Sequence, residues 1–278
     1  MESALIAYSG GVDSTFLLKV AHDVLGDKAV AAIALSPTYP STEMEKAKEM
    51  AEVLGVRHVT IITDELSNPI FASNPPERCY WCKKELFSEL AVVAKKCNLN
   101  HILDGSNRDD TNDFRPGMKA AREFGVRSPL QEAGLGKEEI RLLSRQMGLK
   151  TWNKPSLACL ASRFPYGTKI IEERLRVVDA AEEFLRSLGI TQVRVRHHGS
   201  IARIEVAREE MDKVMQEKIR HKVINKLRVL GYRYVTIDLE GYRTGSMNPV
   251  EPISVAESSH NRRSCPCRRT IARDYIKR

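Results

Sequence analysis

The chain has 278 residues, of which 42% are apolar and 6% aromatic, and 44 Lys and Arg against 36 Asp and Glu give a formal charge of +8. This length predicts one large domain or two ordinary ones, and six cysteines are too few for the disulfide scaffold of a small secreted protein. The longest apolar runs are too short to cross a bilayer, and the N-terminus lacks the pattern of a signal peptide, so we expect a cytoplasmic protein with reduced thiols and no membrane contact.

Short apolar runs alternate with helical patterns through the first half of the chain. Buried parallel strands are predicted at 4–8, 29–35, 58–63 and 101–104. Helical periodicity is found between and after them, at 14–25, 42–54 and 83–97. This alternation predicts an α/β fold with a doubly wound parallel sheet, in which ligands bind at the carboxyl ends of the strands.

The second half of the chain follows a different pattern. It predicts a helix at 172–188, strands at 192–198 and 201–206, a helix at 209–230 and a strand at 234–239. We therefore expect a second, smaller α+β domain. The predicted organisation is a first domain at 1–150, an interdomain loop at 151–167, a second domain at 168–248 and a basic tail at 249–278.

The positive charge is concentrated near the C-terminus. Residues 260–278 carry seven Lys and Arg against Asp274, a net charge of +6, so the rest of the chain is close to neutral. Such a run is typical of a solvated terminus, and we do not expect nucleic-acid binding.

A glycine-rich turn separates the first predicted strand from the first predicted helix. Its glycines let backbone N–H groups approach an anion, two hydroxyls add donors, and the helix N-terminus supplies partial positive charge. It lacks the lysine of a Walker A loop and is not GxGxxG. We interpret it as a phosphate cradle, with an ordinary capped corner as the alternative; its residues are Ser9, Gly10, Gly11, Val12, Asp13 and Ser14.

The hexapeptide SGGVDS after the first strand resembles the PP-loop of the ATP pyrophosphatase superfamily, whose fold is of the adenine nucleotide alpha hydrolase type. Members adenylate a carbonyl or carboxyl oxygen, release pyrophosphate and let a nucleophile displace AMP. The resemblance implies ATP and Mg²⁺ as cofactors. It also implies that Asp13 helps to hold Mg²⁺ and the phosphates, and that Ser36 lies near the adenosine.

Further segments resemble one family of that superfamily, the LarE sulfur transferases. They are ILDGSNRDDTNDFRPG (102–117), RSPLQEAGL (127–135), WNKP (152–155), SRFPYGT (162–168), VRVRHH (193–198) and RYVTIDLEGYRTGSMN (233–248). LarE enzymes convert pyridinium-3,5-dicarboxylate mononucleotide to its bis-thiocarboxylate form, in the synthesis of the nickel-pincer nucleotide of lactate racemase. The resemblance implies this small-molecule substrate and a homo-oligomer.

Three cysteines form the predicted sulfur site. Cys79 and Cys82 form a CxxC pair before a predicted helix, and Cys159 lies in the interdomain loop. Three thiolates are one short of the usual four around a [4Fe–4S] cluster, so one iron would stay open to bind hydrosulfide. In LarE members that use a sacrificial cysteine, that cysteine corresponds to Ala158, which favours the cluster type for this chain.

Other interpretations of the cysteines stay open. Cys79 and Cys82 are also compatible with a Cys₄ zinc site that includes Cys265 and Cys267, or with a redox pair, and Cys159 with a sacrificial sulfur donor. Cys97 continues an apolar helical stripe and is predicted to be a core residue.

The strand VRVRHH predicts a second anion site. Its period of two places Arg194 and Arg196 on one face, and two guanidiniums on a rigid strand suit the substrate's phosphate. Solvated strand arginines are the alternative. Ser162 and Arg163 are candidates for binding a second carboxylate or phosphate, with domain packing as the alternative role of Arg163.

Glu182 interrupts an apolar stripe of the predicted helix 172–188 and therefore needs a partner, for which Arg194, Arg196 or a ligand are candidates. A structural salt bridge is the alternative. The sequence thus predicts an ATP-dependent sulfur transferase with Asp13, Cys79, Cys82, Cys159 and Glu182 as catalytic residues. The competing hypotheses are a PP-loop tRNA thiolase and a nucleotide-binding protein with a structural zinc site.

Overall fold

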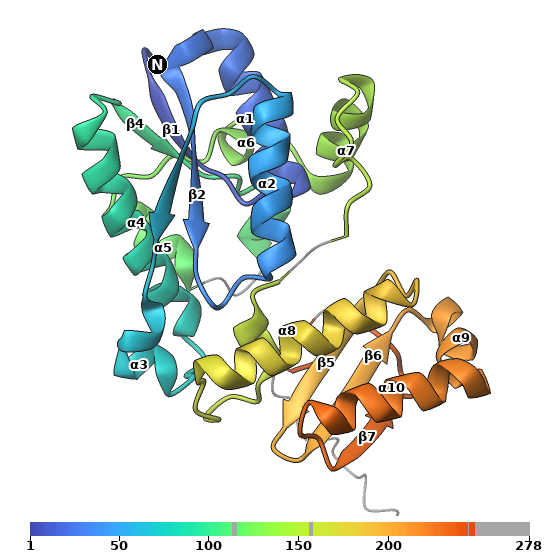
Figure 1. The fold of residues 1–278 in the computed structure, drawn as a ribbon. Helices are drawn as coiled ribbons and strands as arrows, with labels where there is room; N and C mark the ends of the chain where they lie inside the picture. Colours follow the sequence, from blue (N-terminus) through green and yellow to red (C-terminus); the bar gives the residue numbers. More distant parts are fainter. Residues whose placement is uncertain (113–115, 156–157, 244, 248–278) are drawn as a thin grey trace, which may run out of the picture. The chain divides into compact units, whose positions relative to one another are not determined.

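A parallel sheet of four strands lies at the centre of the N-terminal half of the protein, in the order β3-β2-β1-β4 (Figure 1). The structure is a computed structural model that describes residues 1–112, 116–155, 158–243 and 245–247. Residues 1–247 form a single compact unit. The strands of the sheet are β1 (Ala4–Ala7), β2 (Ala29–Leu35), β3 (His58–Ile62) and β4 (His101–Leu103).

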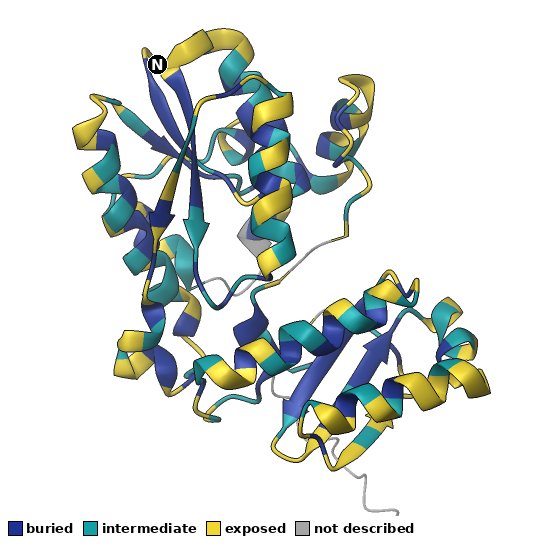
Figure 2. Ribbon diagram, in the orientation of Figure 1, coloured by how far each residue is buried: buried dark blue, intermediate teal, exposed yellow. Residues whose placement is uncertain are grey.

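Helices cover both faces of this sheet. One face carries α1 (Val12–Leu25), α2 (Ser41–Val53) and α7 (Lys137–Gln146), and the other carries α4 (Arg78–Lys96) and α5 (Gly117–Glu123). Alternate residues of β1 face the two layers, with Ile6 packing in the first and Leu5 in the second. Burial on both sides explains the uninterrupted apolar runs of β1 and β2, which are buried except at their C-terminal ends (Figure 2).

Short elements connect these layers. They are the α-helices α3 (Pro69–Ala72) and α6 (Pro129–Glu132), and the 3₁₀ turns η1 (Gly26–Lys28), η2 (Glu65–Ser67), η3 (Arg108–Asn112) and η4 (Leu160–Arg163).

A separate three-stranded mixed sheet follows, in the order β5-β6-β7. Strand β5 (Val193–His198) pairs antiparallel with β6 (Ile201–Val206), and β6 pairs parallel with β7 (Tyr234–Ile237). Val193 and Val195 pack with residues of the covering helices. Those helices are α8 (Glu172–Ser187), α9 (Met211–Met215) and α10 (Glu217–Val229), and the turn η5 (Arg208–Glu210) leads into α9.

The predicted fold class is confirmed: a parallel α/β sheet is followed by a separate mixed sheet. The domain boundaries stay predictions. No helix in the described part of the chain is long and apolar enough to span a membrane.

Three details of the prediction were wrong. The helix predicted from residue 83 begins at Arg78, so both cysteines of CxxC lie inside it. The helix predicted at 209–230 is divided between α9 and α10, because Gln216 takes a non-helical conformation with ψ of 131°. Cys97 is exposed rather than buried, because the buried stripe of α4 runs through Leu90 and Ala94 instead.

Candidate active site

The glycine-rich loop Ser9–Ser14 joins β1 to α1. Gly10 has φ of +69°, and a Cβ placed on it would lie 2.9 Å from the Cβ of Ala47 in α2. The hydroxyl oxygens of Ser9 and Ser14 lie 3.1 Å apart, and the Ser9 N–H donates to the Ser14 hydroxyl at 3.3 Å. The side chains thus brace the loop, whose last residues begin the helix at Val12.

The loop lies where the connections of the sheet diverge. From β1, the chain crosses through α1 to β2 on one side, whereas β4 pairs with β1 on the other side. A Cβ on Gly105, just after β4, would lie 3.0 Å from the backbone nitrogen of Ser14. This is the topological switch point at which open α/β sheets bind ligands.

Two lysines reach this loop from distant parts of the chain. Lys137, the first residue of α7, forms an ion pair with Asp13, and Lys154 donates to the Gly10 carbonyl at 2.9 Å. Lys154 also pairs with Glu43 in α2 at 2.6 Å. The second carboxylate oxygen of Asp13 is buried and has no hydrogen-bond partner among the described residues. The two lysines place positive charge beside a loop that lacks a Walker A lysine.

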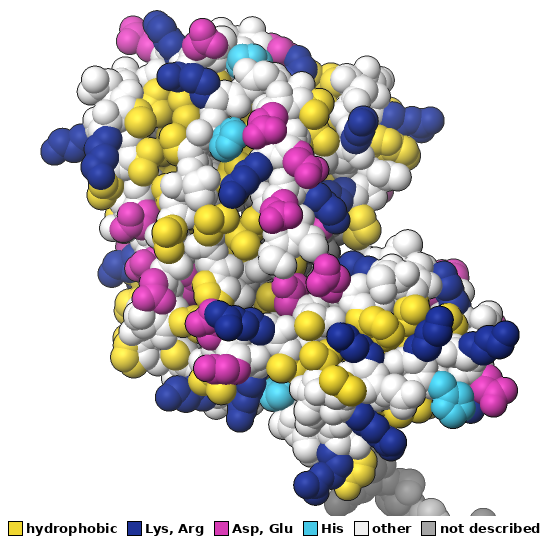
Figure 3. Space-filling view, viewed as in Figure 1, with side chains coloured by type: hydrophobic (Ala, Val, Ile, Leu, Met, Phe, Trp, Pro, Cys, Tyr) yellow, Lys and Arg dark blue, Asp and Glu magenta, His cyan; other side chains and the backbone are white. Residues whose placement is uncertain are grey.

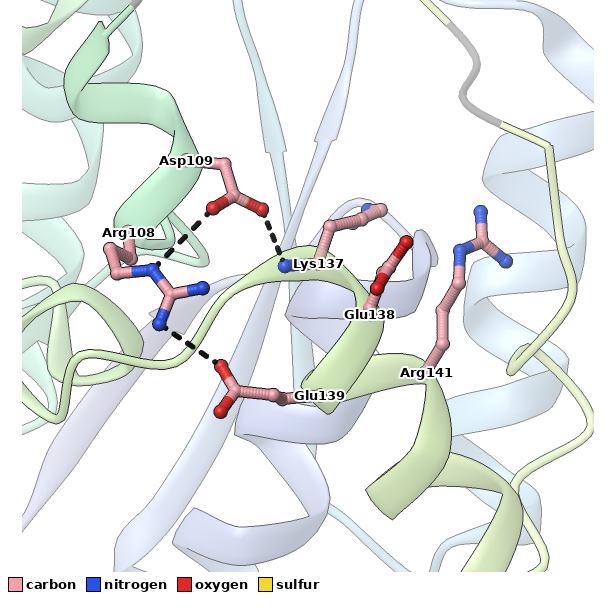
Figure 4. A pocket seen from close by; sticks show the side chains of 6 residues that line it. All are labelled: Arg108, Asp109, Lys137, Glu138, Glu139 and Arg141. Carbon is pink, nitrogen blue, oxygen red and sulfur yellow. Dashed lines mark hydrogen bonds and ion pairs between the residues drawn. The ribbon is translucent and has the colours of Figure 1, made fainter.

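A charged pocket of about 600 Å³ lies at the start of α7 (Figure 4). Its lining includes Lys137, which also pairs with Asp13 of the loop. Asp109 accepts from the Lys137 backbone N–H at 2.7 Å and pairs with Arg108, which also contacts Glu139. The six residues that line the pocket are all charged, and several of them are paired with one another.

The three cysteines of the predicted sulfur site come from two segments. Cys79 and Cys82 lie three residues apart in the first turns of α4 and so share one side of the helix, and Cys159 precedes η4. Cys82 and Cys159 pack against the same apolar cluster around Phe71 and Leu160. The four cysteines that the structure describes are free thiols, with Cys79 exposed and both Cys82 and Cys159 half-buried.

Electrostatic interactions connect these thiols. Burial raises the pKa of Cys82, and Cys159 and Glu65 raise it further. Burial also raises the pKa of Cys159, as do Cys79 and Glu65, while hydrogen bonds from Ala161 and Thr38 lower it. Without a cation, the buried thiols are therefore held in the protonated form.

The donor set agrees in type and number with the predicted cluster. It consists of three sulfur atoms, and a bound cation would offset both the burial and the repulsion between thiolates that raise the pKa of Cys82 and of Cys159. Within the described ranges, however, no three Cys, His, Asp or Glu side chains stand together as a formed metal site. The predicted zinc partners Cys265 and Cys267 lie outside the described residues.

Glu65 joins the end of β2 to the cysteines. Its Oε1 accepts from the hydroxyls of Ser36 and Thr38, both at 2.5 Å, and its Oε2 is buried with no partner among the described residues. The pKa of Tyr39 is raised well above its ordinary value, first by Cys82 and then by burial. Ser36, predicted near the adenosine, thus lies beside a carboxylate that also acts on the thiols.

The four residues predicted to bind the substrate, Ser162, Arg163, Arg194 and Arg196, interact with one another or with Glu182. Arg163 pairs with Glu182, and Arg196 donates to the Ser162 carbonyl at 3.0 Å and to Glu205 at 2.7 Å. Arg194 lies over the ring of Tyr242 at 5.0 Å, and burial, together with Arg163, lowers its pKa to about 10. It remains charged at neutral pH.

Glu182 forms a structural salt bridge, as the alternative interpretation of this residue predicts. Its carboxylate forms ion pairs with Arg163 and Arg186, while Arg194 of β5 also lowers its pKa electrostatically. Burial raises its pKa, but these arginines outweigh burial, and the pKa of Glu182 is lowered overall. The carboxylate also accepts from the Val195 N–H at 3.0 Å, at the edge of the sheet.

Comparisons with known proteins identify the family. A family model described as NAD synthase matches residues 1–77. The chain is 46% identical over 250 residues to an uncharacterized protein of Synechocystis sp., covering 90% of this chain and 93% of that protein. It is 42% identical over 249 residues to pyridinium-3,5-bisthiocarboxylic acid mononucleotide synthase of Lactiplantibacillus plantarum, covering 89% of this chain and 90% of the synthase. The chain belongs to the LarE family, that of this synthase.

The LarE similarity extends to an uncharacterized archaeal protein. The relative from Methanocaldococcus jannaschii is 31% identical over 240 residues, which cover 86% of this chain and 90% of the relative. The matches to these three relatives span both sheets, so both belong to the LarE fold.

Sequence reasoning missed four residues that the structure places beside predicted site residues: Lys137, Lys154, Glu65 and Thr38. The sequence did contain a signal for two of them: Lys154 lies in the WNKP segment that resembles LarE, and Lys137 lies in the first turn of a helix. Glu65 carried none, because a glutamate in a polar connection is indistinguishable in sequence from a solvated one.

Proposed function

We propose that this chain is an ATP-dependent sulfur transferase that converts carboxylates of pyridinium-3,5-dicarboxylate mononucleotide to thiocarboxylates. The observation that carries this proposal is the 42% identity, over 89% of the chain, to the synthase of the pyridinium-3,5-bisthiocarboxylic acid mononucleotide. The braced glycine loop at the switch point of the sheet supports it, because adenylation requires an ATP site.

The loop Ser9–Ser14 binds the β- and γ-phosphates of ATP through its backbone N–H groups and hydroxyls. Lys137 and Lys154 would neutralise phosphate charge, and Asp13 would hold Mg²⁺, which would supply further positive charge to the phosphates. A substrate carboxylate then attacks the α-phosphate, forming the acyl-adenylate and releasing pyrophosphate. Positioning and charge neutralisation account for the catalysis.

The substrate's phosphate is proposed to bind at Arg194 and Arg196, with Ser162 beside them. Arg196 already donates to Glu205 and to the hydroxyl of Ser246, so phosphate binding requires that the network rearrange. Hydrosulfide attacks the acyl carbon and expels AMP, leaving the thiocarboxylate.

Cys79, Cys82 and Cys159 would hold a [4Fe–4S] cluster whose open iron stabilises hydrosulfide as an anion. The protein's own contribution is to carry Cys79 and Cys82 on one side of α4 and to pack Cys82 and Cys159 against the same apolar residues. Residence in the cytoplasm and assembly as a homo-oligomer remain part of this proposal.

Product analysis tests the reaction. Purified protein given ATP, Mg²⁺, sulfide and the pyridinium mononucleotide should form AMP, pyrophosphate and a product in which sulfur replaces carboxylate oxygen, as seen by mass spectrometry. AMP formation should require the mononucleotide. An equal rate of AMP formation without the mononucleotide, or no sulfur in the product, would refute the proposal.

Metal analysis tests the sulfur site separately. Anaerobically purified protein should contain iron and acid-labile sulfide, and Cys79→Ala, Cys82→Ala and Cys159→Ala should each lose most of both. Cys97→Ala is the matched control, because Cys97 is an exposed thiol at the far end of α4. Finding zinc without iron would mean that the cysteines form a structural zinc site and not an iron–sulfur cluster.

A further inference from the structure

The buried ion pair between Arg163 and Glu182 does more than neutralise two charges. Both side chains are 0% exposed, and the guanidinium donates to the carboxylate twice, from Nε at 2.8 Å and from Nη2 at 3.1 Å. Replacing such a pair by apolar residues is often neutral or stabilising, so a buried pair is weak evidence for a stability role.

The remaining nitrogen of Arg163 contacts the cysteine segment. Its Nη1 donates to the carbonyl of Ala158 at 2.8 Å, to that of Cys159 at 3.1 Å and to the Ser162 hydroxyl at 2.9 Å. Two successive carbonyls on one cation fix the direction of both peptide groups that flank Cys159. The Leu160 N–H, which belongs to the second of these peptide groups, donates to the Thr38 carbonyl at 2.8 Å and so ties that peptide to the segment after β2.

Glu182 is in turn fixed to the second sheet. Its carboxylate accepts from the Val195 backbone N–H at 3.0 Å and from Arg186 at 2.6 Å. A continuous chain of hydrogen bonds therefore runs from β5, through Glu182 and Arg163, to the backbone on both sides of Cys159.

We propose that Arg163 is a positioning residue for Cys159, and that Glu182 orients Arg163 without contacting the substrate. The guanidinium holds the Cys159 backbone in the direction that keeps the thiol against the apolar side chains of Phe71 and Leu160. Only the part that the Cys159 thiol plays in sulfur transfer rests on the proposed function.

The test measures access to the Cys159 thiol in the full-length chain, after a chelator and a reductant have freed the thiols. The double variant Arg163→Met/Glu182→Gln removes both buried charges and keeps an acceptor for the Val195 N–H. The control is Arg176→Met/Glu172→Gln, which removes the exposed ion pair in the first turns of the same helix. Alkylation by iodoacetamide is followed peptide by peptide, with the exposed Cys97 as the internal reference.

The double variant should alkylate Cys159 about tenfold faster than the unmodified chain, because the local opening that exposes the thiol becomes easier. The alkylation rate of Cys97, and that of Cys159 in the control variant, should be unchanged. In the single variant Arg163→Lys, Cys159 should keep only part of its protection. Cys159 rates within about twofold of the unmodified chain would overturn the proposal. A general rise at all thiols with a lowered melting temperature would also overturn it, in favour of a purely structural pair. Neither ATP nor substrate is used, so failure here is distinct from failure of the proposed reaction.

Discussion

Gly10 is held in a conformation and a space that only glycine fits. Its φ is +69°, and a Cβ would meet Ala47 at 2.9 Å and the Ala47 Cα at 3.2 Å. The left-handed conformation costs other residues about 1–2 kcal/mol, and here the contact with α2 adds to that cost. The loop and the packing of α2 are thus coupled through one residue.

We expect Gly10→Ala to weaken ATP binding by at least about tenfold, because the loop must move away from α2 to admit the methyl group. Titration calorimetry with MgATP measures this. Gly55→Ala is the matched control: Gly55 has the same φ of +69°, but nothing lies within 4 Å of its Cβ position. Equal ATP affinity of the two variants would show that the contact with Ala47 is not what shapes the loop.

His197 makes the protein sensitive to mild acid. Burial, followed by Arg174 and His198, lowers its pKa to about 4, whereas an unfolded histidine titrates near 6.5. The unfolded chain therefore binds a proton first, and the stability that the neutral imidazole contributes is present above pH 6.5 and is lost as pH falls toward 4. His197 is 6% exposed, and its ring contacts the Tyr232 hydroxyl at 3.1 Å.

We expect this residue to remove about 2 kcal/mol of unfolding free energy between pH 7.5 and pH 5. Urea unfolding at the two pH values, in the unmodified chain and in His197→Gln, measures the contribution by difference. The variant should lose about 2 kcal/mol less over this interval. If both proteins lose the same amount, His197 is not the group that titrates.

At the scale of elements, β5 and β6 present a buried charged face opposite their apolar one. Glu205 is 0% exposed and pairs with Arg196 across the two strands and with Arg203 along its own strand. The side chain of Arg196 is 6% exposed and that of Arg203 is 30% exposed. The two guanidiniums therefore differ in how much solvent can replace them.

We expect Arg196→Met to lower the unfolding free energy by about 3 kcal/mol or more, because it leaves Glu205 buried beside a weaker partner. Arg203→Met should cost about 1 kcal/mol or less, since water compensates for part of a half-exposed pair. Chemical denaturation of both variants measures this. A loss of about 1 kcal/mol or less for Arg196→Met would mean that Arg196 contributes little to the fold, leaving its charge available to the substrate.

The strands were predictable from the sequence because their evidence is local. An apolar run such as 29–35 ends where the strand ends, and the alternation in β5 separates Val195 from Arg196 as predicted. The partners of buried charges were not predictable, because they depend on contacts between distant segments. Glu182 was correctly expected to need a cation, but the sequence offered no means of preferring Arg163 to Arg194. The same holds for Lys137 and Asp13.

At the scale of the whole molecule, charge is unevenly divided along the chain. Residues 249–278 hold seven Lys and Arg against Glu251, Glu257 and Asp274, which is half of the formal charge of +8. On the face shown in Figure 3, Lys and Arg side chains are dispersed, with Asp and Glu side chains among them. This distribution agrees with a small-molecule substrate better than with an extended polyanion.

We expect a chain shortened to residues 1–248 to keep its melting temperature and its thiolation activity, because residues 1–247 form a compact unit by themselves. It should leave a cation-exchange column at lower salt than the full chain. Thermal unfolding and the mononucleotide assay measure the first two properties. Loss of activity with an unchanged melting temperature would assign the tail a role in the reaction.

The carboxylate of Glu65 links the end of β2 both to Ser36 and to the segment of Cys159. Ser36 and Thr38 donate to one oxygen of Glu65, and Thr38 also contacts Cys159 through its hydroxyl and Leu160 through its carbonyl. The part proposed to bind ATP and the part proposed to carry sulfur are consequently not interchangeable modules. Grafting the loop Ser9–Ser14 and its sheet onto another sulfur carrier, or replacing the cysteines by another donor, would require redesign of Ser36, Thr38 and Glu65 as one set.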